Sequence, residues 1–238
     1  MSWGWNASAT LALVSVLAAC SSGGSSPAQQ HVTPTNTPTS AATTPVGEQL
    51  QTLAQSGLRV SYHASYVARQ DKAPHRAEWQ VAHTPAALRI DVVTRVQTAT
   101  LIVSSKGAFS CARAGHRRAC FRVAKPGKPV PAPFDHAPQA LFTSDLHSLA
   151  EHAGDYVITP VSTATGGGRA GDSCFRIRAM SSAPNPRVPT GVYCFAHTGV
   201  LTAIRFPTGS TVRLTNVRMS RPPASVFHPY SSPTPLPG

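Results

Sequence analysis

Val60-Ser61-Tyr62-His63-Ala64-Ser65-Tyr66 alternates apolar and polar side chains. Successive side chains of a β-strand point to opposite faces, so this alternation predicts a strand with one buried and one solvated face. Residues 48–56, just before it, place Leu50, Leu53 and Ala54 on one side of an expected short helix. Gly57 is the expected stop signal of that helix. The chain therefore changes from helical to strand periodicity at about residue 58.

The same two-residue period recurs through most of the remaining chain. Pro, Gly or polar clusters separate the runs, as hairpin-connected antiparallel strands require. The expected strands are 76–83, 88–93, 98–104, 108–112, 119–123, 156–164, 170–179, 188–197, 200–206 and 211–219. A helical period covers residues 139–153, and Gly154 is its expected end. Val212 and Leu214 differ in parity from Val217 and Met219, which predicts a bulge near Thr215-Asn216.

This order of elements predicts an α+β fold that is mostly antiparallel β. A short helix is followed by about six strands, one helix and about five strands. A single sheet of about eleven strands must curl or close, and the two helices are then available to cover its inner face. Gly166-Gly167-Gly168 is expected to be a hairpin turn.

Four cysteines follow residue 100, and an even number of them in an exported protein suggests two disulfides. Three pairings are possible in principle, and proximity in the sequence favours Cys111–Cys120 and Cys174–Cys194. Zinc is the competing interpretation, but the chain has no Cys-x-x-Cys pair. We expect no metal site and no cofactor.

Strand parity separates the cysteines from a set of inward-pointing side chains. If Cys174 and Cys194 are bonded across neighbouring strands, they share the outer face with Arg176 and Arg178. The opposite face is then apolar and aromatic, and it is the predicted ligand-binding lining. Its expected members are Tyr62, Tyr66, Trp79, Val81, Ile90, Val92, Phe175, Ile177, Tyr193, Phe195, Ile204 and Phe206. The alternative is that the same residues form a plain packed core.

The N-terminal segment carries a targeting pattern. An apolar run from Ala9 ends in Leu17-Ala18-Ala19-Cys20 and is too short to span a bilayer. It resembles the lipobox of bacterial lipoproteins, although residues 1–19 lack the usual Lys or Arg. The resemblance implies a signal peptide over 1–19, lipid on the Cys20 thiol and an extracytoplasmic protein anchored to the cell membrane.

Composition divides the remaining chain. Residues 20–46 start at the lipidated Cys20 and continue as a Ser/Thr/Pro-rich stretch without charged residues, which predicts a disordered tether. About 25 such residues would hold the domain roughly 25–30 Å from the membrane. The domain is expected over 47–230, with a Pro-rich tail over 231–238. The whole segment from Pro222 onward is expected to pack loosely.

All charged residues lie between Glu48 and Arg221, and 21 basic against 9 acidic residues give a net charge of +12. In an exported protein this charge favours anionic lipid headgroups or a cell-wall polymer over nucleic acid as partner. His116, Arg113, Arg117 and Arg118 crowd the expected loop between Cys111 and Cys120. The alternative is that the charge only keeps a monomeric domain soluble.

The layout as a whole resembles the LolA-like lipoproteins of actinobacteria, a group that includes mycobacterial lipid-carrying lipoproteins. The resemblance covers roughly residues 48–230 and rests on the lipobox, the tether, the cysteine placement and the closing segment Pro223-Ala224-Ser225-Val226-Phe227. It implies a half-barrel of antiparallel strands, with helices over its concave face and an apolar cavity that holds acyl chains.

Sequence motifs give no support for an enzyme. Gly171-Asp172-Ser173 is similar to the Gly-Asp-Ser of some serine hydrolases, but it lies in an alternating strand and no Gly-x-Ser-x-Gly elbow exists. His147 and His152 lie five residues apart on the expected helix, which is poor spacing for a shared metal. We therefore expect a protein that binds or carries a lipid or other amphiphile. The alternative is a solidly packed module that binds a protein or wall polymer.

Overall fold

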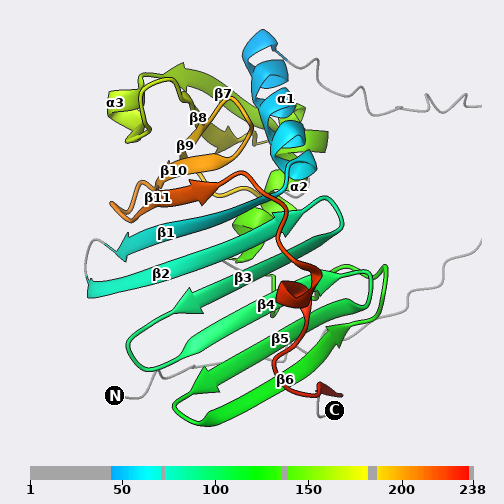
Figure 1. Ribbon diagram of the computed structural model, residues 1–238. Coiled ribbons are helices and arrows are strands. Elements are labelled where there is room, and N and C mark those ends of the chain that lie inside the picture. Colours follow the sequence, from blue (N-terminus) through cyan, green and yellow to red (C-terminus); the bar gives the residue numbers. More distant parts are fainter. Residues whose placement is uncertain (1–43, 71–72, 136–138, 182–186, 236–238) are drawn as a thin grey trace, which may run out of the picture. The chain divides into compact units, whose positions relative to one another are not determined.

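The computed structural model describes residues 44–70, 73–135, 139–181 and 187–235 (Figure 1). The lipidation site expected at Cys20 and its tether up to residue 43 therefore lie outside the described residues. The helices are α1 (Pro45–Arg59), η1 (Gln139–Phe142), α2 (Ser144–Glu151), η2 (Ala153–Asp155), α3 (Thr163–Gly166) and η3 (Ala224–Phe227). The first six strands are β1 (Tyr62–Gln70), β2 (Ala73–Thr84), β3 (Ala87–Val93), β4 (Thr98–Ser104), β5 (Gly107–Ala114) and β6 (Arg117–Ala124). The others are β7 (Tyr156–Val161), β8 (Ser173–Ala179), β9 (Gly191–Phe195), β10 (Leu201–Arg205), β11 (Thr211–Arg218) and β12 (Thr234–Pro235).

All the strands belong to one open, curved sheet, in the order β12-β6-β5-β4-β3-β2-β1-β11-β10-β9-β8-β7. Every pairing is antiparallel except the short parallel contact of β12 with β6. The chain starts at the centre with β1 and moves outward to β6. It then crosses through η1 and α2 to the far edge and returns through β7–β11 to pair β11 with β1 (Figure 1). The predicted α+β half-barrel is confirmed, with β12 as an additional strand.

Helices α1 and α2 cover the inner face of the sheet. Leu50 and Ala54 of α1 are fully buried in the main core, and Leu146 and Leu149 of α2 join them. The two helices are tied together where α2 ends, because the side-chain amides of Gln51 and Gln55 both donate to the Ala150 carbonyl oxygen, at 2.9 and 3.1 Å. These bonds satisfy a carbonyl that lies in the last turn of its helix.

Gly57 lies inside α1 and does not stop it, which corrects the sequence prediction. The helix continues to Arg59, and the Gly57 backbone meets Gly199 in the turn between β9 and β10. A Cβ atom on Gly57 would come within 2.4 Å of the Gly199 carbonyl oxygen. Gly199 has a φ of +81°, a conformation that favours glycine. The missing side chains let α1 lie directly against the sheet.

The predicted bulge lies at Thr215. In the β1–β11 pair, Ser65 faces Asn216 and Tyr66 faces Leu214, which leaves Thr215 without an opposite residue. The Thr215 hydroxyl donates to the Ser65 carbonyl oxygen at 2.9 Å. The bulge restores the inward direction of Val217 after that of Leu214, as the change in parity requires.

Both predicted disulfides are present. Cys111 lies opposite Cys120 in the β5–β6 pair, and Cys174 lies opposite Cys194 in the β8–β9 pair. Both pairs lie on the outer face, which was predicted from parity for Cys174–Cys194. The predicted glycine turn is instead the one-turn helix α3 with Gly167 as its left-handed cap, and Gly166 packs on the Cys174–Cys194 bridge.

The C-terminal segment packs more closely than its proline content predicts. Its described part crosses the outer face of the sheet, opposite α2, and η3 contacts β3 and β4 (Figure 1). Phe227 is 7% exposed and packs with Ala82, Ile102 and Phe109. The expectation of loose packing is therefore wrong for Pro222 and Phe227, which are buried, whereas residues 232–235 are exposed.

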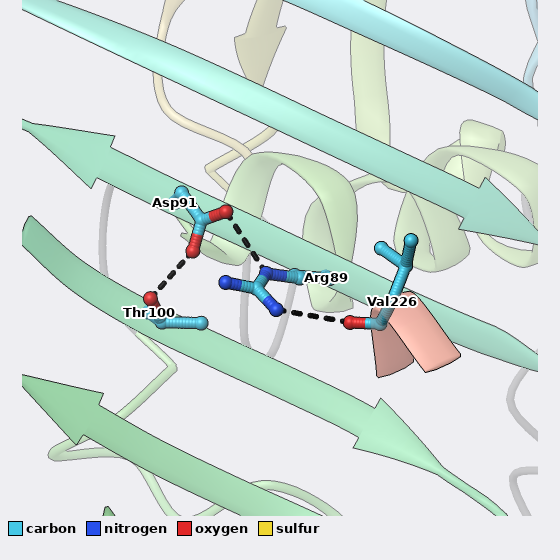
Figure 2. Close-up of polar contacts among 4 residues, drawn as sticks. All are labelled: Arg89, Asp91, Thr100 and Val226. Carbon is cyan, nitrogen blue, oxygen red and sulfur yellow. Dashed lines mark hydrogen bonds and ion pairs between the residues drawn. The ribbon is translucent and has the colours of Figure 1, made fainter. Parts of the chain in front are cut away.

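A half-buried ion pair holds this segment (Figure 2). Arg89 donates from Nη to the Val226 carbonyl oxygen at 3.0 Å and from Nε to Asp91 Oδ2 at 2.9 Å. Asp91 also accepts a short hydrogen bond from the Thr100 hydroxyl. Because Asp91 fixes the guanidinium, the remaining N–H groups of Arg89 are oriented toward the crossing segment.

Gly57→Ala should lower the free energy of unfolding by about 1–3 kcal/mol, the usual cost of overpacking. Alanine normally stabilises a helix interior by about 1 kcal/mol relative to glycine. Here we expect the substitution to destabilise the protein instead, because the new methyl group would meet the Gly199 backbone. Urea unfolding measures the change. Thr52→Ala, on the exposed side of α1, is the matched control and should leave stability nearly unchanged. A stabilised Gly57→Ala protein would contradict the close approach.

Candidate functional site

A groove of about 780 Å³ opens on the inner side of the sheet, at the end of the strands where β2 turns into β3. Its walls come from the end of α1, the β2–β3 turn, the loop after β6, the start of α2 and residues 187–189. The lining residues are Leu58, His83, Thr84, Pro85, Ala86, Ala87, Leu88, Val103, Lys128, Pro129, Val130, Ala132, Asp135, Ala140, Phe142, Thr143, Ser144, Asp145, His147, Arg187 and Pro189. Its volume falls in the range of small-molecule sites.

One wall of the groove is apolar. Leu58, Leu88, Val103 and Val130 contribute aliphatic side chains, and Phe142 closes the wall toward the core. The Phe142 ring lies 5.3 Å from that of Tyr66 and 6.4 Å from that of Trp79. Phe142 is therefore the boundary between the groove and the packed interior.

The same lining carries ionisable groups. Asp135, Asp145 and Arg187 come from three separate segments, and Lys128 and His147 complete the set. Burial is the main cause that raises the pKa of Asp145 to about 7, and the neighbouring Asp135 carboxylate adds to it. Arg187 and the Ser144 hydroxyl act in the opposite direction. Asp145 can therefore gain or lose a proton near neutral pH.

His83 contributes a neutral ring to the groove. Its Nδ1 lies 2.8 Å from the Val60 carbonyl oxygen, which can only accept, so Nδ1 carries the proton. Burial lowers the pKa of His83, and the ring stacks on Tyr62 with centroids 5.1 Å apart. The two aromatic groups form an uncharged floor at this end of the inner face.

The predicted lining residues lie on the inner face but outside the groove. Ten of the twelve are buried in the main core, and Val92 and Phe206 pack against it. None of them lines the groove. Their direct contact with a ligand therefore remains a prediction, and in this structure they fill the space between the sheet and the two helices.

Sequence reasoning missed the residues that do line the groove, because they come from several separate loops, helices and strand ends. In the sequence, Asp145 looks like an ordinary acidic residue at the start of a helix, and Arg187 is one of many arginines. The Pro-rich loop over 126–133 was the one sequence signal for the groove, because a loop that follows six strands must cross an end of the sheet.

Other candidate residues have structural contacts. The Asp172 carboxylate accepts from the Arg169 backbone N–H and from the Thr202 hydroxyl, each at 2.6 Å, which fixes the turn before β8. His152 and Glu151 are exposed, with 3.9 Å between their charged atoms. The described ranges contain no group of three or more potential metal-ligating side chains. In the same residues, no helix is long and apolar enough to cross a bilayer.

Comparisons give structural similarities at low identity. No protein-family model and no curated protein matches the chain. A chain of the Pseudomonas aeruginosa MucA/MucB complex aligns with a TM-score of 0.48 and 11% identity, over 78% of this chain and 61% of its own length. An uncharacterized conserved protein from Thermus thermophilus aligns with a TM-score of 0.47 and 7% identity, over 79% of this chain and 98% of its own length. A DUF1329 family protein from Desulfovibrio piger aligns with a TM-score of 0.37 and 9% identity, over 76% of this chain and 95% of its own length. This chain thus spans about three-fifths of the first structure.

Asp145 should make the domain less stable as pH rises from about 4 to 7. Because its pKa is higher in the folded state, the folded protein binds the extra proton in this window, so unfolding becomes easier as that proton is lost. Asp145→Asn removes this dependence and should be more stable than the wild type above pH 7, by at most about 4 kcal/mol. Urea unfolding between pH 5 and 8 tests this, with Glu151→Gln on the exposed side of α2 as control. Parallel pH curves for wild type and Asp145→Asn would refute it.

Proposed function

We propose that this protein is an extracytoplasmic, membrane-anchored protein that binds a lipid or other amphiphile in the groove beside α2. The observation that carries this proposal is the composition of the groove: aliphatic side chains and ionisable groups line the same open volume. An amphiphile has the same two parts. Its chain would pack on Leu58, Leu88, Val103 and Val130, and its polar end would reach Asp145 and Arg187.

The energy available from the apolar wall is sufficient for this role. Each buried methylene contributes about 0.8 kcal/mol. An alkyl chain of about ten carbons would therefore gain roughly 8 kcal/mol before the costs of association, which are several kcal/mol. The ionisable groups of the lining would then select the headgroup more than they add affinity.

Two features support the proposed compartment. The disulfides Cys111–Cys120 and Cys174–Cys194 are typical of oxidising environments. The Leu17-Ala18-Ala19-Cys20 sequence supports lipidation of Cys20. Together with the half-barrel that the LolA-like resemblance implies, they favour an extracytoplasmic lipoprotein.

A second candidate function is binding of a protein segment or wall polymer by a domain whose interior is closed. The burial of ten of the twelve predicted inner residues favours it. It differs from the first proposal in requiring no apolar ligand in the groove, and the following experiment separates the two.

Ala132→Trp should abolish binding of a fluorescent fatty-acid probe. Ala132 is exposed and lines the groove, so a tryptophan there fills the groove without disturbing the core. Ala119→Trp, on an exposed position of β6, is the control and should bind as the wild type does. Fluorescence titration of the purified full chain measures the affinity. A wild type that takes up no probe would favour the second candidate function.

Cys20→Ala should abolish incorporation of a metabolically supplied fatty acid in a lipoprotein-producing bacterial host. The Cys20 thiol is the proposed nucleophile for lipid attachment, and alanine cannot replace it. Labelling and membrane fractionation of the full chain measure the effect. Cys20→Ala protein that still carries label would disprove the lipidation.

A further inference from the structure

The arginines of the sheet are concentrated on its outer face. Strand parity and register place eleven of the twelve strand arginines on the side that carries the disulfides. They are Arg69, Arg76, Arg89, Arg113, Arg118, Arg122, Arg176, Arg178, Arg205, Arg213 and Arg218. The strand carboxylates on this face are Glu78 and Asp91. The positive charge of the domain is thus directed to one face.

Five of these residues form what we call the arginine belt: Arg69, Arg76, Arg176, Arg205 and Arg213. One cross-strand row runs Arg76–Arg69–Thr211–Arg205–Val192–Arg176 through six adjacent strands, from β2 to β8. Arg213 stands in the next row, opposite Val67 and Ala203. Neighbouring strands lie about 4.8 Å apart, so the row spans about 24 Å.

The belt is exposed, and its charge is largely uncompensated. All five side chains are exposed. Among the described residues, only Arg76 of the belt pairs with a carboxylate, that of Glu78 at 3.6 Å. Arg205 donates to the Thr165 carbonyl oxygen at 3.3 Å, which orients its guanidinium without neutralising it. In the sequence between β1 and β2, Asp71 and Lys72 carry opposite charges and add no net charge.

This arrangement does not serve stability. Arg69 and Arg76 face each other directly across two strands, and like charges in that position are destabilising. Core packing does not require them, since their side chains point away from the main core. Every lysine in the described residues lies in a turn or loop, so the strands use arginine alone. Arginine is the side chain suited to paired contacts with phosphate oxygens.

We infer that the arginine belt docks the domain on an anionic phospholipid membrane. The inference depends on the compartment proposed above but not on the cargo of the groove. An exported domain on a short tether meets lipid phosphates at high effective concentration, so weak contacts suffice. Each arginine near an anionic surface contributes about 1 kcal/mol. Nucleic acid would need a different compartment.

Docking through the belt also sets the direction of the groove. The belt lies at the end of the strands where β10 turns into β11, on the left of Figure 1. The groove lies on the inner side, near the β2–β3 turn at the other end. Arg76 and Thr84 are separated by eight residues of β2, which is about 26 Å. The docked domain would therefore hold its groove away from the lipid surface and open to a soluble partner or a facing membrane.

Vesicle sedimentation of the full-length chain tests the inference, with Cys20→Ala in every protein so that no attached lipid contributes. Phosphatidylcholine vesicles containing one-third phosphatidylglycerol should bind the protein, and added salt should release it. Combined Arg69→Gln, Arg176→Gln and Arg205→Gln should lower the partition coefficient about a hundredfold. The control, Arg59→Gln with Lys106→Gln and Lys125→Gln, removes the same charge from exposed sites off the belt. It should bind nearly as the parent does.

Several results would overturn membrane docking. The control triple variant could lose as much affinity for the vesicles as the belt variant. Binding would then depend on the net charge of the protein and not on the arginine belt. Equal binding to pure phosphatidylcholine would remove the electrostatic basis. Stronger, belt-dependent binding to a soluble polyanion such as DNA would assign the belt to another partner. Melting temperature and fatty-acid probe binding of each variant, measured in parallel, show that the fold and the groove are intact, so failure of docking is distinguishable from failure of amphiphile binding.

Discussion

The pairing of β1 with β11 is the interaction on which the rest of the structure depends. It joins two strand sets that are about 150 residues apart in the sequence, as the hydrogen bond from Thr215 to Ser65 illustrates. A shift of one residue would exchange the two faces of one half of the sheet. The bulge at Thr215 prevents this, because Tyr66 and Leu214 remain on the inner face together with Ala64 and Val217. The continuous core and the arrangement of the arginine belt across β1, β11 and β10 both follow from that register.

Much of this architecture could be predicted from the sequence, because strand parity is a local property. Alternation around Tyr62 and Tyr66 identified the inner face, and the change of parity after Leu214 identified the bulge. Cysteine proximity gave both disulfides. Gly57 was misinterpreted, since a glycine in a helix looks like a stop signal unless its partner Gly199 is known. That contact joins residues far apart in the chain, and no local pattern reports it.

The groove was beyond sequence reasoning for the same reason. Its walls are brought together by the crossing from β6 to β7, and the environment of Asp145 depends on Asp135 and Arg187, which come from other segments. Alternation places a side chain on a face but does not show whether that face is filled. Phe142 closes the core from the groove, because its ring occupies the space between the groove and Tyr66.

The two faces of the sheet differ in chemistry. The inner face carries the apolar core and a groove at one end of the strands, whereas the outer face carries charge at the other end. The C-terminal segment crosses the outer face, where Arg89 donates to the Val226 carbonyl oxygen, and it buries Phe227 on apolar residues that the sheet would otherwise expose. With that patch covered, the accessible outer face is dominated by arginine. The outer face of such a tethered domain would dock through charge and not through apolar contact, so docking of the domain would weaken as the salt concentration rises.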